Sequence, residues 1–260
     1  MVNKQLVDEF ACALQSNGNL AKQTLEKVFN TFTNKMSEKE IKQALLECYP
    51  ALVEHYGNIA AAAAVDFYNQ QREQYIREHQ SQASDYNADV AEPINWSYTK
   101  TDVRKIMARF PATSNILSLY NTLDGQAQTR IMNQADRTIV RAAERDPLHP
   151  KWALVPSISA CPFCRLMGSF GFHYNAENTA ARARHKPNPT PCKCNLVVDF
   201  DVTHPMLEGY DPDKMYCRFS KIAGKLGIDF TRDNQRKTKA RDMLLKEMAK
   251  MQQTENRSKK

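Results

Sequence analysis

The sequence predicts a mainly α-helical protein with a helical N-terminal part, a small α+β cysteine-rich module and a basic C-terminal helix. Only 8 of the 260 residues are glycine, which disfavours a turn-rich all-β fold and glycine-dense phosphate loops. Apolar residues recur at helical spacing through most of the chain. Hydrophobic residues make up 42% and charged residues 25%, as in soluble globular proteins that bury a core.

Residues 1–79 form the predicted N-terminal helical region. Apolar residues at helical spacing predict two short amphipathic helices, Asn3 to Leu14 and Leu20 to Phe32. A capping box made by Ser37 and Glu40 then predicts the start of a third helix, because each residue can bond a backbone amide of the other.

After Pro50 a longer helix is expected to run to about His79. Its broad apolar stripe includes Ala60 to Ala64, whose small side chains allow another helix to approach closely. Residues 80–100 are polar, are interrupted by Pro93 and show no helical period, so we expect a linker or long loop there.

Residues 101–150 form a second predicted helical region. The expected helices are Thr101 to Arg109, Ser114 to Leu123 and Ala127 to Arg145. Asp124-Gly125 is interpreted as the turn between the last two, and Asp146-Pro147 as the final stop.

Residues 151–210 combine proline, glycine, histidine and cysteine with a β-prone run, Leu196 to Phe200. Cys161 and Cys164 form a CxxC knuckle, and 27 residues separate it from the CxC pair of Cys192 and Cys194. Two thiolates on a tight turn can face one tetrahedral Zn²⁺, and a second pair can complete four ligands. The spacing therefore predicts a structural zinc site.

Other interpretations of these thiols remain open. His185 or His173 could replace one sulfur ligand. The thiols could instead form disulfides, be unrelated, or include one redox or catalytic cysteine. The other three cysteines lie in helical patterns and are expected to pack as small apolar residues: Cys12, Cys48 and Cys217.

Residues 211–260 form a basic tail. They hold 14 Lys/Arg and 7 Asp/Glu, so the whole net charge of +7 lies there. The densest cluster comprises Arg232, Arg236, Lys237, Lys239 and Arg241. Such a cluster can contact nucleic acid or an acidic partner, although a solvated helical face gives the same count.

Several function classes find no support in the sequence. Motifs for a Walker loop, a dinucleotide site, a serine nucleophile elbow and an HExxH metalloprotease are missing, so no small-molecule substrate is evident. The remaining histidines are interpreted as surface or capping residues: His55, His79, His149 and His204. The longest apolar run, Ile59 to Val65, is too short to cross a bilayer and no signal peptide precedes it, so we expect a cytosolic chain without a membrane partner.

Residues from about 50 to 220 resemble the MuF-like minor head proteins of tailed bacteriophages, a family often labelled capsid maturation proteases. The matching residues are Tyr56 to Ala63, Phe67, Tyr68, Arg72, Arg137, Thr138, Arg141 to Ala143, Asp146, Pro147, Trp152, Cys161 to Ser169, Tyr174, His185, Cys192 to Cys194, Glu208 to Asp213 and Tyr216.

The resemblance implies a minor structural protein that acts in procapsid assembly near the portal, in the virion head and, during assembly, in the host cytoplasm. Its partners would be portal, capsid or scaffold proteins. The charge of the tail separately predicts a contact with packaged DNA. The enzyme alternative is a head maturation protease, and a further alternative is a zinc-stapled nucleic-acid-binding module. No Ser/His/Asp order can be picked from spacing, and zinc-bound thiolates are not free nucleophiles.

Overall fold

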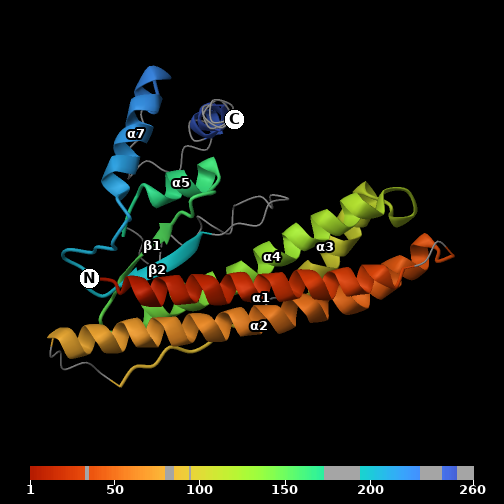
Figure 1. Ribbon diagram of the computed structural model, residues 1–260, viewed down its shortest axis with the longest axis horizontal. Helices are drawn as coiled ribbons and strands as arrows, with labels where there is room; N and C mark the ends of the chain where they lie inside the picture. Colours follow the sequence, from red (N-terminus) through yellow and green to blue (C-terminus); the bar gives the residue numbers. More distant parts are fainter. Residues whose placement is uncertain (33–34, 80–84, 94, 173–193, 229–241, 251–260) are drawn as a thin grey trace.

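Four helices lie alongside one another as a bundle, and a smaller group of elements follows them at one end (Figure 1). The computed structural model describes residues 1–32, 35–79, 85–93, 95–172, 194–228 and 242–250. The helices of the bundle are α1 (Lys4–Asn30), α2 (Glu38–His79), α3 (Trp96–Arg109) and α4 (Ala112–Arg145). The elements after the bundle are β1 (Lys151–Val155), α5 (Pro162–Gly168), β2 (Asn195–Asp199) and α7 (Pro212–Lys225). The prediction of a mainly helical protein is confirmed.

Helix α1 is one helix of 27 residues, so the prediction of two short helices was wrong. Asn3 caps its start by accepting from two backbone amides. At the expected break, the Asn17 side chain donates to the carbonyl of Tyr56 over 2.8 Å, and Gln128 donates to the carbonyl of Gly18 over 2.6 Å. These contacts from α2 and α4 hold the helical backbone through residues of low helix propensity.

Helix α2 begins where the capping box predicts. The Ser37 amide donates to the Glu40 carboxylate over 2.7 Å, and the Glu40 amide donates to the Ser37 hydroxyl over 3.3 Å. The helix ends at His79 as expected, but it also runs through Pro50, which was predicted to divide it. Proline removes one backbone hydrogen bond. Pro50 is buried in the bundle, so packing along a 42-residue helix offsets that loss.

The alanine stripe of α2 is buried at three of its five positions. Ala60, Ala61 and Ala64 are at most 1% exposed, whereas Ala62 is exposed and Ala63 is half-buried. The close-packed seam is therefore narrower than the run of alanines.

Residues 85–93, which lie between α2 and α3, are hydrogen-bonded to the bundle. The Ala88 amide donates to the Asn69 side chain over 3.0 Å, and the Ala91 amide donates to the Thr138 hydroxyl over 3.2 Å. Helix α3 begins at Trp96, earlier than the expected Thr101, because Asn95 accepts from a backbone amide of the first turn and caps it.

Helix α4 continues through Asp124-Gly125, so the predicted turn there was wrong. The Thr129 hydroxyl donates to the Gly125 carbonyl over 2.8 Å, and Tyr49 of α2 donates to the Leu123 carbonyl over 3.2 Å. A break in helical dihedrals lies instead at Asn115. The helix ends before Asp146, as predicted.

Strands β1 and β2 form a two-stranded antiparallel sheet. Lys151 pairs with Asp199, and Val155 pairs with Asn195. The β-prone run near residue 196 is confirmed as a strand, whereas its partner was not predicted. The sheet contacts α2 and α4, and the ring centroid of Phe200, which follows β2, lies 5.4 Å from the ring centroid of Tyr68.

The chain is helical from Pro212 to Lys225, as expected after Asp211. Asp211 caps α7 by accepting from the Lys214 amide over 2.9 Å. Residues 242–250 form a further helical segment, in which Leu244 is fully buried and Met243 is 47% exposed. None of the helices in the described ranges is long and apolar enough to span a membrane.

Candidate functional site

Three of the four predicted zinc-binding cysteines lie at one end of the small sheet. Cys161 directly precedes α5 and is half-buried, and Cys164 lies within α5 and is fully buried. Cys194 directly precedes β2 and is 1% exposed. The fourth cysteine and both alternative histidine ligands lie outside the described residues: Cys192, His185 and His173.

The loop between β1 and α5 links these cysteines. The Ser157 amide donates to the Cys194 sulfur over 3.5 Å, and the Ser157 carbonyl accepts from the Ala160 amide, which precedes Cys161. Arg165 of α5 donates back to the carbonyls of Ala160 and Ile158, each over 3.0 Å. The loop therefore holds Cys194 next to the entry to the CxxC knuckle.

The donor chemistry of this corner suits zinc. Thiolate sulfur is a preferred ligand of Zn²⁺, and a backbone amide that donates to sulfur stabilises the charged thiolate form. Within residues 1–172, 194–228 and 242–250, less the short gaps, no group of three or more His, Cys, Asp or Glu side chains has the arrangement of a metal site. Cys161, Cys164 and Cys194 therefore do not form a three-ligand group by themselves, and a tetrahedral set would also need ligands from residues 173–193.

Close backbone contacts fix α5 on the sheet. A Cβ atom added at Gly168 would lie 2.8 Å from the carbonyl oxygen of Leu154 and 2.7 Å from the Cδ of Pro156. The Tyr210 hydroxyl donates to the Gly168 carbonyl. Only a residue without a side chain can occupy position 168 in this arrangement.

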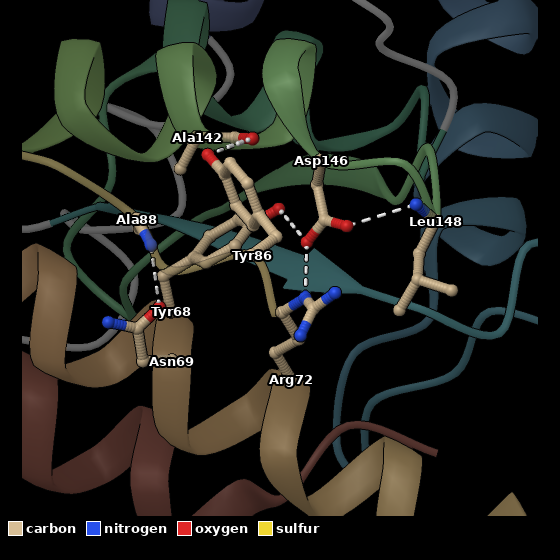
Figure 2. A network of polar contacts seen from close by, with 8 residues as sticks. All are labelled: Tyr68, Asn69, Arg72, Tyr86, Ala88, Ala142, Asp146 and Leu148. Carbon is tan, nitrogen blue, oxygen red and sulfur yellow. Dashed lines mark hydrogen bonds and ion pairs between the residues drawn. The ribbon is translucent and has the colours of Figure 1, made fainter. Parts of the chain in front are cut away.

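A buried polar network joins α2 to the end of α4 (Figure 2). Arg72 Nε lies 2.8 Å from Asp146 Oδ2, and the exposed fractions of the two side chains are 6% and 0%. The same oxygen accepts from the Tyr68 hydroxyl over 3.1 Å, and Asp146 Oδ1 accepts from the Leu148 amide over 2.9 Å. Both carboxylate oxygens are thus engaged within the fold.

The segment after α2 closes over this network. The Tyr86 hydroxyl donates to the Ala142 carbonyl over 3.0 Å, and the Arg72 guanidinium carbon lies 5.5 Å from the centroid of the Tyr86 ring. Burial, followed by the nearby Asp146 carboxylate, raises the pKa of Tyr68 and of Tyr86. Both phenols therefore stay neutral and donate hydrogen bonds, so the network has the chemistry of a structural clamp.

Sequence reasoning named Arg72 and Asp146 within the resemblance but did not pair them. The two residues are 74 positions apart, and a single sequence carries no signal that links positions at such a separation. The one available indication was the charge of Arg72, because a charged residue on the apolar side of a helix requires a buried partner.

Other cysteines and histidines form no site in the described residues. Cys12 and Cys217 are exposed, so the expectation that they pack as apolar residues was wrong. Cys48 is half-buried, and burial raises the pKa of its thiol. The four histidines interpreted as surface residues are all exposed: His55, His79, His149 and His204. The predicted basic cluster lies outside the described residues: Arg232, Arg236, Lys237, Lys239 and Arg241.

Comparisons with known proteins place the chain in a family. Searches of the curated proteins and of the solved structures returned no significant match. The family model described as VG15 protein matches residues 1–222, which include the whole helical bundle, the sheet and the first part of α7. The chain therefore belongs to the VG15 protein family, a family of phage-type viral proteins.

Proposed function

We propose that this phage protein is a minor structural protein of the head, similar to the MuF-like proteins, and that it acts in procapsid assembly near the portal. Its partners would be portal, capsid or scaffold proteins, and its place would be the virion head. Membership of a phage family supports this proposal. The resemblance of residues 50–220 to the MuF-like proteins also supports it.

The observation that carries the proposal is that residues of the resemblance make buried contacts between elements of the fold. Phe67 stacks on Phe10 with ring centroids 4.6 Å apart, and Arg72 and Asp146 form the buried ion pair. Trp152 is 3% exposed in β1. These residues of the resemblance hold elements of the fold together, which is the role expected in a structural protein.

The direct experiment is to delete the chain from the phage that encodes it and to restore it on a plasmid. We expect purified heads to contain the restored chain and its absence to reduce the yield of filled heads, measured by electron microscopy and mass spectrometry. Heads that lack the chain when it is supplied, together with normal assembly without it, would refute the proposal.

The same preparation tests the protease alternative. Cleavage of a scaffold or capsid protein that depends on the chain and is lost in Cys161→Ala, while zinc content is unchanged, would favour the enzyme. The matched control is Cys217→Ala, which removes an exposed cysteine outside the predicted zinc-binding set.

We also propose that Cys161, Cys164, Cys192 and Cys194 hold one structural Zn²⁺, with His185 or His173 as an alternative fourth ligand. The sulfur-rich corner between the loop and α5 supports this assignment. Bound zinc would supply folding free energy, on the order of 10 kcal/mol at neutral pH, to a region whose elements are short. The cysteines themselves would orient the loop and α5 around it.

Metal analysis of the full chain tests the zinc proposal. We expect one zinc per chain, lost in Cys164→Ser but retained in Cys48→Ser, which changes a cysteine of α2. A chelator should also make the paired cysteines more reactive to alkylation. Less than one zinc, with alkylation equal in native and denatured protein, would refute the site.

A further inference from the structure

Helix α7 carries a single file of positive charge on its exposed side. Its four cations are all exposed: Lys214, Arg218, Lys221 and Lys225. Their successive separations of four, three and four positions return to the same side of a helix at every turn. The file therefore runs over about 16 Å, given a rise of 1.5 Å per residue.

The opposite side of α7 fixes this orientation. Phe219, Ile222 and Ala223 are at most 7% exposed, and the helix packs against α5. The ring centroid of Tyr216 lies 6.5 Å from that of Phe170, which follows α5. Because the apolar side is anchored, the helix cannot rotate the file of cations towards the protein. In Figure 1, α7 stands clear of the bundle formed by α1, α2, α3 and α4.

Helix α3 shows that charge content alone does not produce such a file. It also has 14 residues, four cations and one aspartate. Its cations are Lys100, Arg104, Lys105 and Arg109. Arg104 and Lys105 are neighbours in sequence and point about 100° apart, and Lys100 and Arg109 point in nearly opposite directions. The cations of α3 therefore spread around half of the helix.

The positions beside the file on α7 favour close approach of a regular polyanion. Cys217 and Gly224 are small and exposed on this side, and α7 holds a single acid, Asp213. Proteins that bind single-stranded nucleic acid stack its unpaired bases on exposed aromatic rings, and α7 has no exposed aromatic ring. The backbone of duplex DNA carries one charge per about 1.7 Å, so the file would run past about ten phosphates.

We propose that the exposed basic side of α7 binds the phosphate backbone of duplex DNA without sequence preference. The contact follows from Lys214, Arg218, Lys221 and Lys225 and does not depend on a role in head assembly. Binding releases counterions from the DNA, so it weakens steeply as salt rises.

A matched pair of triple variants of the full chain tests this proposal. K214Q/K221Q/K225Q removes three cations of α7, and R104Q/K105Q/R109Q removes three exposed cations of α3, with the same change in net charge. Affinity for a 30-bp duplex of arbitrary sequence is measured between about 50 and 200 mM salt. We expect the α7 variant to lower the slope of log affinity against log salt by about 2.7, and the α3 variant to leave it nearly unchanged. Equal thermal midpoints confirm that both variants fold.

Three outcomes would overturn the proposal. Equal losses in both variants would show that total charge governs binding. Undiminished binding by the α7 variant would assign the contact to other cations, such as those of residues 232–241. The third outcome is that the wild-type chain binds polyglutamate more tightly than DNA and loses this binding in the α7 variant. That result would show that the exposed side of α7 binds an acidic protein.

Discussion

The helical bundle and the region after Lys151 are stabilised in different ways. In the bundle, α1 and α2 are 27 and 42 residues long and bury an apolar side along their length. After Lys151 the strands have five residues each, and α5 has seven. Long helices distribute burial over many contacts, whereas short elements depend on a few close contacts and on cross-links. Single substitutions should therefore act through volume and charge in the bundle and through individual backbone contacts after it.

The largest effect is expected from Ala64→Arg in the seam of α2. Ala64 is fully buried, so the substitution both overpacks the bundle and buries a charge without a partner. We expect a loss of about 4 kcal/mol or more in the free energy of unfolding, measured by chemical denaturation. Ala62→Arg is the control, because Ala62 is exposed in the same helix and should tolerate the change within about 0.5 kcal/mol. Equal effects at the two positions would contradict a packed seam.

The clamp that joins α2 to the end of α4 should be nearly as sensitive. Asp146→Ala leaves Arg72 without its carboxylate and removes the acceptor of the Tyr68 hydroxyl, so we expect a loss of about 3–5 kcal/mol. Tyr68→Phe removes one hydrogen bond and should cost about 1 kcal/mol. Glu144→Ala is the control on the exposed surface of α4. A clamp variant as stable as this control would show that the ion pair contributes nothing.

A smaller loss is expected from Gly168→Ala after the bundle. The new methyl group would collide with the Leu154 carbonyl and the Pro156 ring, which would displace α5 at a cost of about 1–3 kcal/mol. Gly224→Ala in α7 is the matched control, because nothing lies within 4 Å of its added Cβ. It should stabilise the helix by about 0.5–1 kcal/mol. Thermal unfolding of the two variants should therefore shift in opposite directions.

The smallest effects are expected from two carboxylates whose pKa values shift in opposite directions. Burial raises the pKa of Asp124 in α4, so its folded state binds a proton more tightly and stability should rise as pH falls through that raised value. Asp124→Asn should increase the neutral-pH unfolding midpoint and remove this rise.

Asp201, after β2, behaves in the opposite way. Hydrogen bonds from the His204 amide and the Thr203 hydroxyl lower the pKa of Asp201 to about 2. Its contribution is therefore present above its ordinary pKa, near 3.8, and is lost as pH falls from about 4 to about 2. Asp201→Asn should flatten the stability profile in that window, with a modest effect because the carboxylate is close to solvent. Identical acid profiles for wild type and variant would show that these bonds do not form in solution.

Local signals predicted the ends of elements better than their continuity. The Ser37 capping box, the stop before Asp146 and the start of α7 after Asp211 were predictable, because each depends on side chains within a few residues. The breaks expected near Gly18, Pro50 and Gly125 were wrong. At these positions the helices continue because neighbouring helices contact them, and helix propensity is a weak preference that packing overrides.

In the candidate sites too, features that depend on neighbouring residues were predictable, and features that depend on distant segments were not. The spacing of Cys161 and Cys164 was sufficient to predict a sulfur-rich site, because both cysteines lie in one turn of chain. The proximity of Cys194 to Ser157 depends on β1, a strand that the sequence did not reveal. The file of cations on α7 was present in the spacing of its residues, but its exposure depends on which side of the helix packs against α5.

By itself, the sequence determined the helical class, the caps, the basic tail and the cysteine pairs, since each follows from composition or from residues within one or two turns. Tertiary structure decided which helices run unbroken, that Arg72 meets Asp146, and which side of each helix faces water. The physical reason is that these features depend on desolvation and packing between segments far apart in the chain, and both are determined only when the segments meet.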